Sequence, residues 1–258
     1  MKVAILAGGL GTRIAEESHL KPKPMIEIGG KPIIWHIMKG YSHFGFNDFV
    51  ILAGYKQEVI KDYFANYFLY NSDVTFRLSD NKIDVHNVMS EDWSVTVLDT
   101  GLKSMTGARV KVLEKYIEDA SFMLTYGDAV SDIDINQLLR YHKRHGKIAT
   151  ITTVSNVQGK GVLDINTDGE VMSFREKIDQ DSVLINGGYM IFEREIFRYI
   201  DDSELCVLEE ETMTRLVEDH QLMAYHHKGF WQCMDTKKEM DQLEYYWSSG
   251  EAPWEIWR

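Results

Sequence analysis

The chain has 258 residues, of which 44% are hydrophobic and 26% are charged, and its formal net charge is -12. This composition excludes an intrinsically disordered chain. The acidity argues against a nucleic-acid partner, since such binding draws on clustered Lys and Arg. No apolar stretch approaches the roughly 20 residues that span a bilayer, so we expect no membrane partner either.

Apolar, β-branched runs alternate with helical patterns along the first half of the chain. The patterns predict strands at 2–7, 48–54 and 121–130, and helices at 31–45 and 56–68. Continuous apolar strands separated by helices indicate a mainly parallel sheet with helices on both faces. The fold class is therefore expected to be α/β, with a Rossmann-like sheet.

Two stretches in the middle of the chain, 73–88 and 94–101, alternate polar and apolar residues more clearly. We interpret them as a small antiparallel insertion or edge hairpin. The second half is expected to hold helices at 135–146, 194–200, 209–219 and from about Thr236, and strands at 148–154, 185–193, 222–227 and two within 161–177. No internal repeat or linker interrupts the pattern, so we expect a single domain over residues 1–258.

The amino-terminal segment is basic although the chain as a whole is acidic. Residues 1–31 hold five Lys and Arg against three Glu, a local charge of +2, and the remaining 227 residues sum to -14. A small basic site in an acidic body suits a small polyanionic ligand. Charge alone leaves a solvated basic loop as the alternative.

A glycine cluster follows the first predicted strand. Open α/β sheets bind ligands at the carboxyl ends of their strands, and glycines let backbone N–H groups approach phosphate oxygens closely. The segment lacks the Gly-Lys-Ser/Thr ending of a P-loop, and a dinucleotide fingerprint built on Gly9 and Gly11 meets Ile14 at the third glycine position. Neither of these phosphate-binding motifs fits.

The string Gly-Gly-Leu-Gly-Thr-Arg at 8–13, followed by Lys-Pro-Lys-Pro-Met at 21–25, resembles the signature loop of sugar-1-phosphate nucleotidyltransferases. "DTGLKSMTGARV", "LTYGDAVSDID", "INGGYMIF", "GFWQCMDT" and "APWEIW" look like the glucose-1-phosphate cytidylyltransferase branch of that family. The resemblance spans the whole chain. It implies the nucleotidyltransferase fold, with a nucleotide-binding half at about 1–130 and a sugar-binding and oligomerisation half at about 131–258.

The activity that the resemblance implies is Mg²⁺-dependent transfer of CMP from CTP to a sugar 1-phosphate. The expected acceptor is α-D-glucose 1-phosphate, and the expected products are pyrophosphate and CDP-glucose, a precursor of deoxysugars. A nucleotidyltransferase that uses another nucleoside triphosphate or another phosphorylated acceptor is one alternative. A non-catalytic nucleotide-sugar sensor is the alternative from a different class.

The resemblance assigns nucleotide contacts to two loops. Arg13 would hold the departing phosphates, and Lys23 would reach the α-phosphate and the sugar phosphate. The remaining nucleotide-binding residues implied are Leu6, Ala7, Gly8, Gly9, Leu10, Gly11 and Thr12 in the first loop, and Ser104, Thr106, Gly107 and Arg109 in the second. Arg109 would approach phosphate or base. Thr106 could cap a helix instead of binding nucleotide, or could do both.

A metal site and a sugar site complete the implied centre. Asp128 follows a buried strand, and a strand-end carboxylate facing the ligand crevice suits Mg²⁺. The resemblance places the second ligand at Asp235, although an Asp at that position could instead cap the final helix. The sugar-binding residues implied are Tyr126, Gly127, Glu176, Lys177, Asn186, Gly187, Gly188 and Trp231.

The sequence departs from the family pattern at two places. Ala129 stands where the family has a glycine, and Lys160 stands in an aromatic position of a loop near the sugar side. The second departure leaves the acceptor open. We expect His142 and His145 to lie on a solvated helix face.

The closing segment and the cysteines suggest the setting in which the protein works. Trp247, Trp254 and Trp257 crowd the tail and are expected to pack in the core or between subunits of a homo-oligomer. Cys206 and Cys233 are the two cysteines, and they fit a cytoplasmic location.

Overall fold

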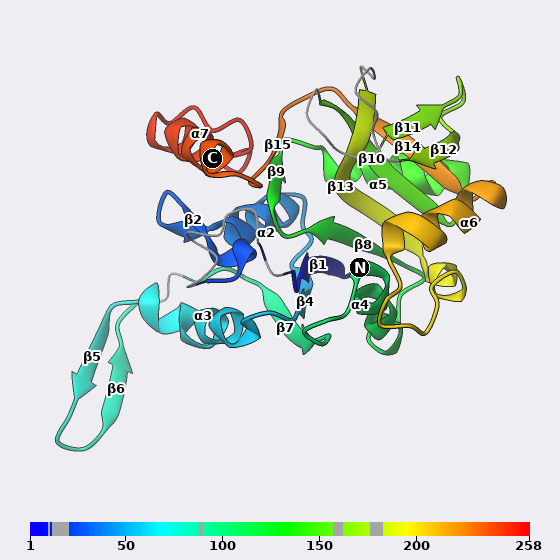
Figure 1. Ribbon diagram of the computed structural model, residues 1–258. Coiled ribbons are helices and arrows are strands. Elements are labelled where there is room, and N and C mark those ends of the chain that lie inside the picture. Colours follow the sequence, from blue (N-terminus) through cyan, green and yellow to red (C-terminus); the bar gives the residue numbers. More distant parts are fainter. Residues whose placement is uncertain (10, 12–20, 88–89, 157–161, 176–182) are drawn as a thin grey trace.

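The structure, a computed structural model, describes residues 1–9, 11, 21–87, 90–156, 162–175 and 183–258 (Figure 1). A nine-stranded sheet forms its centre. Four parallel strands lie side by side in the order β7 (Ser94–Asp99), β4 (Asp48–Ala53), β1 (Val3–Ala7) and β8 (Ser121–Tyr126). The mainly parallel α/β fold expected from the sequence is confirmed.

One long strand reverses direction beside β8. Strand β13 (Val183–Glu193) pairs antiparallel with β8 and with β10 (Ala149–Asn156), and β14 (Leu222–His227) continues the sheet parallel to β10. A hairpin of β11 (Val162–Ile165) and β12 (Val171–Arg175) attaches to the amino-terminal part of β13. Because β13 runs against its neighbours, its first residues lie at the same sheet edge as the carboxyl ends of the parallel strands.

Helices cover both faces of the sheet, because alternate residues of each strand point to opposite sides. In β1, Val3 and Ile5 enter one apolar core and Ala4 enters the other. The first core is packed by α2 (Ile33–His43), α3 (Gln57–Tyr70), α5 (Ile135–His145) and α7 (Lys237–Ser248), and the second by α4 (Thr106–Val112) and α6 (Met213–Glu218). Within the described part of the chain, none of the helices has the length and apolarity needed to cross a membrane.

The interpretation of 94–101 as part of an antiparallel insertion is wrong. This stretch is β7, which pairs in parallel with β4 from Asp48↔Ser94 to Ala53↔Asp99 at the edge of the central sheet. An edge strand is covered less fully than a central one, so Val95 and Val97 are only partly buried and the pattern alternates. The stretch 73–88 does contain an antiparallel hairpin, β5 (Val74–Arg77) with β6 (Lys82–Val85).

Two short pairings were not anticipated from the sequence. Strand β2 (Glu27–Ile28) pairs with β3 (Lys31–Pro32), and β9 (Ala129–Ser131) pairs with β15 (Trp231–Cys233). The predicted strand 121–130 is therefore two strands, interrupted at Gly127 and Asp128. The predicted helices at 194–200 and 209–219 are a 3₁₀ helix at Arg194–Arg198 and a π-helical turn at Leu208–Thr212 that leads into α6.

The tryptophans of the tail pack within the chain around a buried histidine. Trp254 donates to Nδ1 of His36 at 3.3 Å, and Nε2 of His36 contacts the Ile28 carbonyl at 2.9 Å. Trp247 and Trp257 also lie against the His36 ring. Core packing, one of the two expected roles, therefore applies to these tryptophans, and burial lowers the pKa of His36 to about 4.

The expectation of a solvated face for His142 and His145 is wrong. The Lys147 N–H donates to His145 Nδ1, so His145 carries its proton on Nε2 and donates to Thr150 Oγ1 at 2.7 Å. Thr150 then donates to His142 Nδ1 at 2.7 Å, and His142 Nε2–H faces Glu193 at 3.0 Å. These bonds fix the tautomer of His142, and its burial, with only 1% of the side chain exposed, keeps the ring neutral by lowering its pKa.

Lowering the pH is expected to destabilise the fold through this chain. Burial, assisted by the charge of Lys143, lowers the folded-state pKa of His142 to about 4 from the ordinary 6.5. As the pH falls below 6.5, the unfolded chain takes up the proton first. The free energy of unfolding should therefore be undiminished above that pH and should fall by about 2 kcal/mol down to pH 5.

Guanidinium unfolding between about pH 7.5 and pH 5 measures this loss. His142→Gln should reduce the slope, and exposed His43→Gln should leave it unchanged. An equal slope in His142→Gln and the wild type would contradict the assignment.

Candidate active site

A cleft of about 300 Å³ opens at the carboxyl ends of β1 and β8. Twelve of the residues implied by the sequence line it: Leu6, Ala7, Gly8, Gly9, Gly11, Lys23, Ser104, Thr106, Arg109, Tyr126, Gly127 and Asp128. Segments far apart in the sequence thus meet where an open α/β sheet is expected to bind its ligand. Leu10, Thr12, Arg13, Lys160, Glu176 and Lys177 lie outside the described residues.

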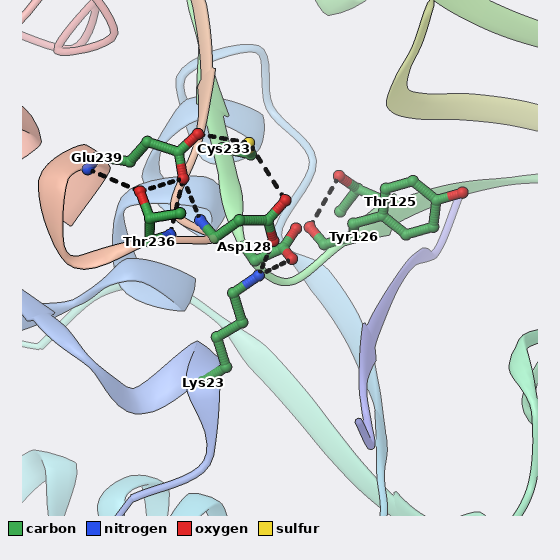
Figure 2. Close-up of polar contacts among 8 residues, drawn as sticks. Lys23, Thr125, Tyr126, Asp128, Cys233, Thr236 and Glu239 are labelled. Carbon is green, nitrogen blue, oxygen red and sulfur yellow. Dashed lines mark hydrogen bonds and ion pairs between the residues drawn. The ribbon is translucent and has the colours of Figure 1, made fainter. Parts of the chain in front are cut away.

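The Lys23 ammonium lies between the two carboxylates implied as metal ligands (Figure 2). Its Nζ is 2.5 Å from Asp128 Oδ2 and 2.5 Å from Asp235 Oδ1. Burial acts to lower the pKa of Lys23, but Asp128 and then Asp235 outweigh it, and the pKa is raised. Two carboxylates that are 107 residues apart in the chain therefore converge on one cation.

Local backbone geometry accounts for each member of this group. Lys23 begins a 3₁₀ turn between Pro22 and Pro24, and the fixed φ of proline limits the directions in which the lysine can point. Asp128 follows the end of β8. The β9–β15 pairing aligns Ala129 with Cys233, and the Met234 N–H donates to the Asp128 carbonyl at 2.8 Å, which brings the next residue, Asp235, to Lys23 at the edge of the cleft, although Asp235 does not itself line the cleft. Ala129, the first departure from the family pattern, is accommodated as a buried strand residue.

Helix α7 is capped by Thr236, not by Asp235. The Thr236 side chain accepts from the Glu239 N–H, and the Glu239 carboxylate accepts from the Thr236 N–H, which is a complete capping box. The same Glu239 oxygen accepts from the Asp235 N–H at 2.7 Å. The Asp235 carboxylate is thereby left to face Lys23, and the capping alternative for Asp235 does not apply.

Arg109 is 5% exposed and bonds to the protein rather than pointing into open solvent. Its guanidinium donates to the Gly8 carbonyl at 3.0 Å, the Gly101 carbonyl at 2.8 Å and Thr100 Oγ1 at 2.5 Å. Burial lowers its pKa, and the charge of Asp99 partly opposes this shift. In this structure Arg109 holds the loops that follow the strands.

The close approach of this guanidinium explains one glycine of the first loop. A Cβ at Gly8 would lie 2.1 Å from Arg109 Nη1, so any side chain there would displace the arginine. Gly9 is different, because a Cβ there would meet nothing within 4 Å. The two neighbouring glycines therefore have different constraints.

The second loop is positioned by the segment that precedes α6. Helix α4 begins at Thr106, its N-cap is Met105, and no side chain caps it, so the predicted capping role of Thr106 is wrong. Thr106 Oγ1 accepts from the Leu208 N–H and donates to Glu209 at 2.5 Å. Gly107 does not line the cleft, and a Cβ there would lie 2.6 Å from Cys206 Sγ.

Side chains expected to bind sugar form a connected group beside the cleft. Asn186 donates to the Tyr126 hydroxyl at 3.3 Å and accepts from the Gly188 N–H at 2.8 Å. A Cβ at Gly188, where φ is +79°, would lie 2.4 Å from the Tyr126 ring. Trp231 donates to the Gly187 carbonyl at 2.7 Å.

Sequence reasoning missed Glu209 and Glu239. Glu239 had a detectable signal, because Thr236-Lys-Lys-Glu239 has the Thr-x-x-Glu spacing of a capping box. Glu209 stands in "LEEET" with nothing to distinguish it from its neighbours. It bonds to Thr106 and, at 2.6 Å, to the Tyr126 hydroxyl.

The carboxylate pair fits a hard divalent cation that also binds phosphate oxygens, since such ions need few protein ligands. Asp128 and Asp235 already share one positive group, and Glu239 orients the backbone of Asp235. Within the described ranges, no cluster of three or more His, Cys, Asp or Glu forms a separate metal site.

Comparisons with known proteins agree with the fold. The family model described as "Nucleotidyl transferase" matches residues 2–248. The chain is 50% identical over 258 residues to the glucose-1-phosphate cytidylyltransferase of Salmonella typhimurium, and 38% identical over 257 residues to the probable glucose-1-phosphate cytidylyltransferase of Bacillus subtilis. Both alignments cover 100% of each chain.

Two solved structures share the fold at low sequence identity. HddC from Yersinia pseudotuberculosis superposes with a TM-score of 0.76 at 22% identity, covering 95% of this chain and 99% of that one. UDP-glucose pyrophosphorylase in complex with UDP-glucose gives a TM-score of 0.76 at 16% identity, covering 96% and 98%.

Glu239→Ala is expected to damage both the helix start and the carboxylate group. Loss of the capping box should lower the free energy of unfolding by about 1 kcal/mol. The freed Asp235 backbone should also weaken Mn²⁺ binding, measured by electron paramagnetic resonance. Lys238→Ala, an exposed change next to it, is the control. Unchanged Mn²⁺ affinity in Glu239→Ala would show that Glu239 acts on the helix alone.

Proposed function

Because this chain belongs to the nucleotidyl transferase family, in its glucose-1-phosphate cytidylyltransferase branch, we propose that it transfers CMP from CTP to α-D-glucose 1-phosphate. The products are CDP-glucose and pyrophosphate. The observation that carries this proposal is the 50% identity to the Salmonella cytidylyltransferase over the full length of both chains. We assign the reaction to the cleft at the strand ends, which is lined by the glycine loop, Lys23 and Asp128.

The reaction joins two polyanions, so charge neutralisation and positioning supply most of the catalysis. An oxygen of the sugar phosphate attacks the α-phosphorus of CTP, and pyrophosphate leaves. Lys23, at the cleft, neutralises charge at the α-phosphate and the sugar phosphate, and Arg13 holds the departing phosphates. No covalent intermediate with the protein is required, and backbone groups of the glycine loop orient the triphosphate.

We assign Mg²⁺ to Asp128 and Asp235. Both carboxylates already contact the same ammonium, and two carboxylates plus phosphate oxygens are a common Mg²⁺ environment. When bound, Mg²⁺ neutralises charge on the phosphates of the nucleotide. Glu239 fixes the Asp235 backbone, and the β9–β15 pairing keeps the two carboxylates together.

Base and sugar selection are assigned to the two sides of the cleft. Ser104 and the α4 amino terminus meet the base, while Arg109 maintains the loop that surrounds it. We assign sugar contacts to Tyr126, Asn186 and the glycines after it, and, from the family resemblance, to Glu176, Lys177 and Trp231. Buried polar groups reject a substrate that leaves them unpaired, so these few contacts are sufficient for specificity.

We propose that the reaction takes place in the cytoplasm. Cys206 and Cys233 are both buried thiols that are not joined in a disulfide, which fits a reducing compartment.

We also propose that the protein is a homo-oligomer joined through the β5–β6 hairpin. The hairpin projects away from the body of the subunit (Figure 1). Phe76 and Ile83 are directly paired and are 53% and 51% exposed, and the Val74–Val85 pair lies on the same face. An isolated two-stranded hairpin is marginal in water, so an apolar face of this kind needs cover.

Turnover is tested by pyrophosphate release with Mg²⁺, CTP and α-D-glucose 1-phosphate, with UTP, dTTP and ATP as controls. We expect selective turnover with CTP. Lys23→Ala, Asp128→Asn and Asp235→Asn should each lower kcat by about 100- to 1,000-fold, as lost charge stabilisation does elsewhere. Selective turnover with another nucleotide or another sugar phosphate would show that the substrate assigned here is wrong. Full activity in Asp128→Asn would refute the metal site.

Assembly is tested by light scattering after size exclusion. Phe76→Asp combined with Ile83→Lys should shift the mass toward that of a single 29.9 kDa chain, because charges on the apolar face oppose its burial. Thr75→Lys, on the opposite polar face of β5, should leave the mass unchanged. An unaltered mass in the double variant would show that the interface does not involve this hairpin.

A further inference from the structure

We propose that Glu209 is a positioning residue that couples the nucleotide side of the cleft to the sugar side. This inference rests on the proposed function, because it concerns how the two substrate subsites are held relative to one another. Glu209 lies on the π-helical turn Leu208–Thr212, on a different element from either subsite. It contacts one residue from each.

Both carboxylate oxygens of Glu209 are used. Oε1 accepts from the Tyr126 hydroxyl at 2.6 Å, and Oε2 accepts from Thr106 Oγ1 at 2.5 Å. These are short, charge-assisted hydrogen bonds, which are stronger and more directional than neutral ones. Tyr126 ends β8 and Thr106 begins α4, so one side chain joins the two elements at the cleft.

The direction of these bonds is set by other donors. Thr106 Oγ1 already accepts from the Leu208 N–H at 3.0 Å, and the Tyr126 hydroxyl accepts from Asn186 Nδ2 at 3.3 Å. Each hydroxyl therefore directs its proton to Glu209. This arrangement needs two acceptor oxygens on one side chain, which a carboxylate provides and an amide does not.

The chain of bonds continues into both subsites. On the sugar side, Asn186 is fixed in turn by the Gly188 N–H, and the Tyr126 ring packs where Gly188 lacks a Cβ. On the nucleotide side, α4 carries Arg109, whose guanidinium bonds to the Gly8 carbonyl of the first loop. A displacement of Glu209 would therefore shift residues in both subsites.

The test is a double-mutant cycle on equilibrium binding and on turnover. Tyr126→Phe, a change on the sugar side, should weaken CTP binding, and Thr106→Val should raise the KM for glucose 1-phosphate, each by about fivefold. Glu209→Gln should raise both KM values by about tenfold and change kcat less, because Lys23 and the two aspartates are untouched. When Glu209 is already Gln, Tyr126→Phe should no longer weaken CTP binding, and Thr106→Val should no longer raise the KM for glucose 1-phosphate.

Controls separate positioning from folding. Glu210→Gln, an exposed change on the same turn, should keep wild-type constants. Near-ultraviolet circular dichroism establishes that each variant is folded, and Glu209→Gln keeps the size of the native side chain. A purely structural role would reduce the folded fraction while the folded protein kept wild-type KM values.

The possible results distinguish this proposal from the proposed function. If Tyr126→Phe leaves the Kd of CTP unchanged and Thr106→Val alters only the KM for CTP, the coupling role is overturned. Calorimetry of CTP with the unmodified protein and Tyr126→Phe needs no turnover, so it decides the matter even if glucose 1-phosphate is not the acceptor. Failure of the unmodified protein to turn over CTP with glucose 1-phosphate would count only against the proposed function.

Discussion

The architecture of the cleft depends on one buried guanidinium. The carboxyl ends of β1, β4 and β7 present carbonyl groups that have left the sheet ladder, and such groups need partners. Arg109 is a partner common to three of them: it bonds to the carbonyls of Gly8 and Gly101 and reaches that of Ala53 at 3.4 Å, while Thr100 bridges it to the same strand end. The first residue of the glycine loop, Gly8, is therefore held by the Arg109 guanidinium without a bound ligand. The close packing also explains why Gly8 has no room for a side chain.

The basic amino-terminal segment and the acidic body meet at Lys23. Its ammonium balances part of the charge on Asp128 and Asp235, so the cleft does not contain two partly buried carboxylates without compensation. The basic charge of the amino-terminal segment is thus used, at Lys23, to bind two carboxylates of the acidic body. Glu239 adds the geometric control, because one carboxylate caps α7 and also holds the Asp235 backbone.

Much of the cleft could be predicted from local sequence. The strand followed by glycines, the second Lys-Pro pair (Lys23-Pro24) and the strand-end Asp128 each have a short-range signature, and each contributes residues that line the cleft. Residues whose roles depend on distant partners could not be predicted. The β9–β15 pairing joins strands of three residues that are too short to produce a pattern, and Glu209 acts through Thr106 and Tyr126, each more than 80 residues away. His142 was misassigned because its helix is strongly polar, while its burial comes from strands that follow later in the chain.

Strand β13 runs antiparallel to β8, and this direction separates the residues assigned to substrate binding from the buried histidine chain. Asn186 to Gly188, the fourth to sixth of its 11 residues, lie beside the cleft, and its last residue, Glu193, lies about 17 to 23 Å further along the strand. Substrate handling is concentrated at one end of this strand, and the neutral histidine chain at the other. Changes at sites this far apart that share no partners add nearly independently. Natural substitutions near His142 can therefore change how the free energy of unfolding depends on pH without changing substrate specificity.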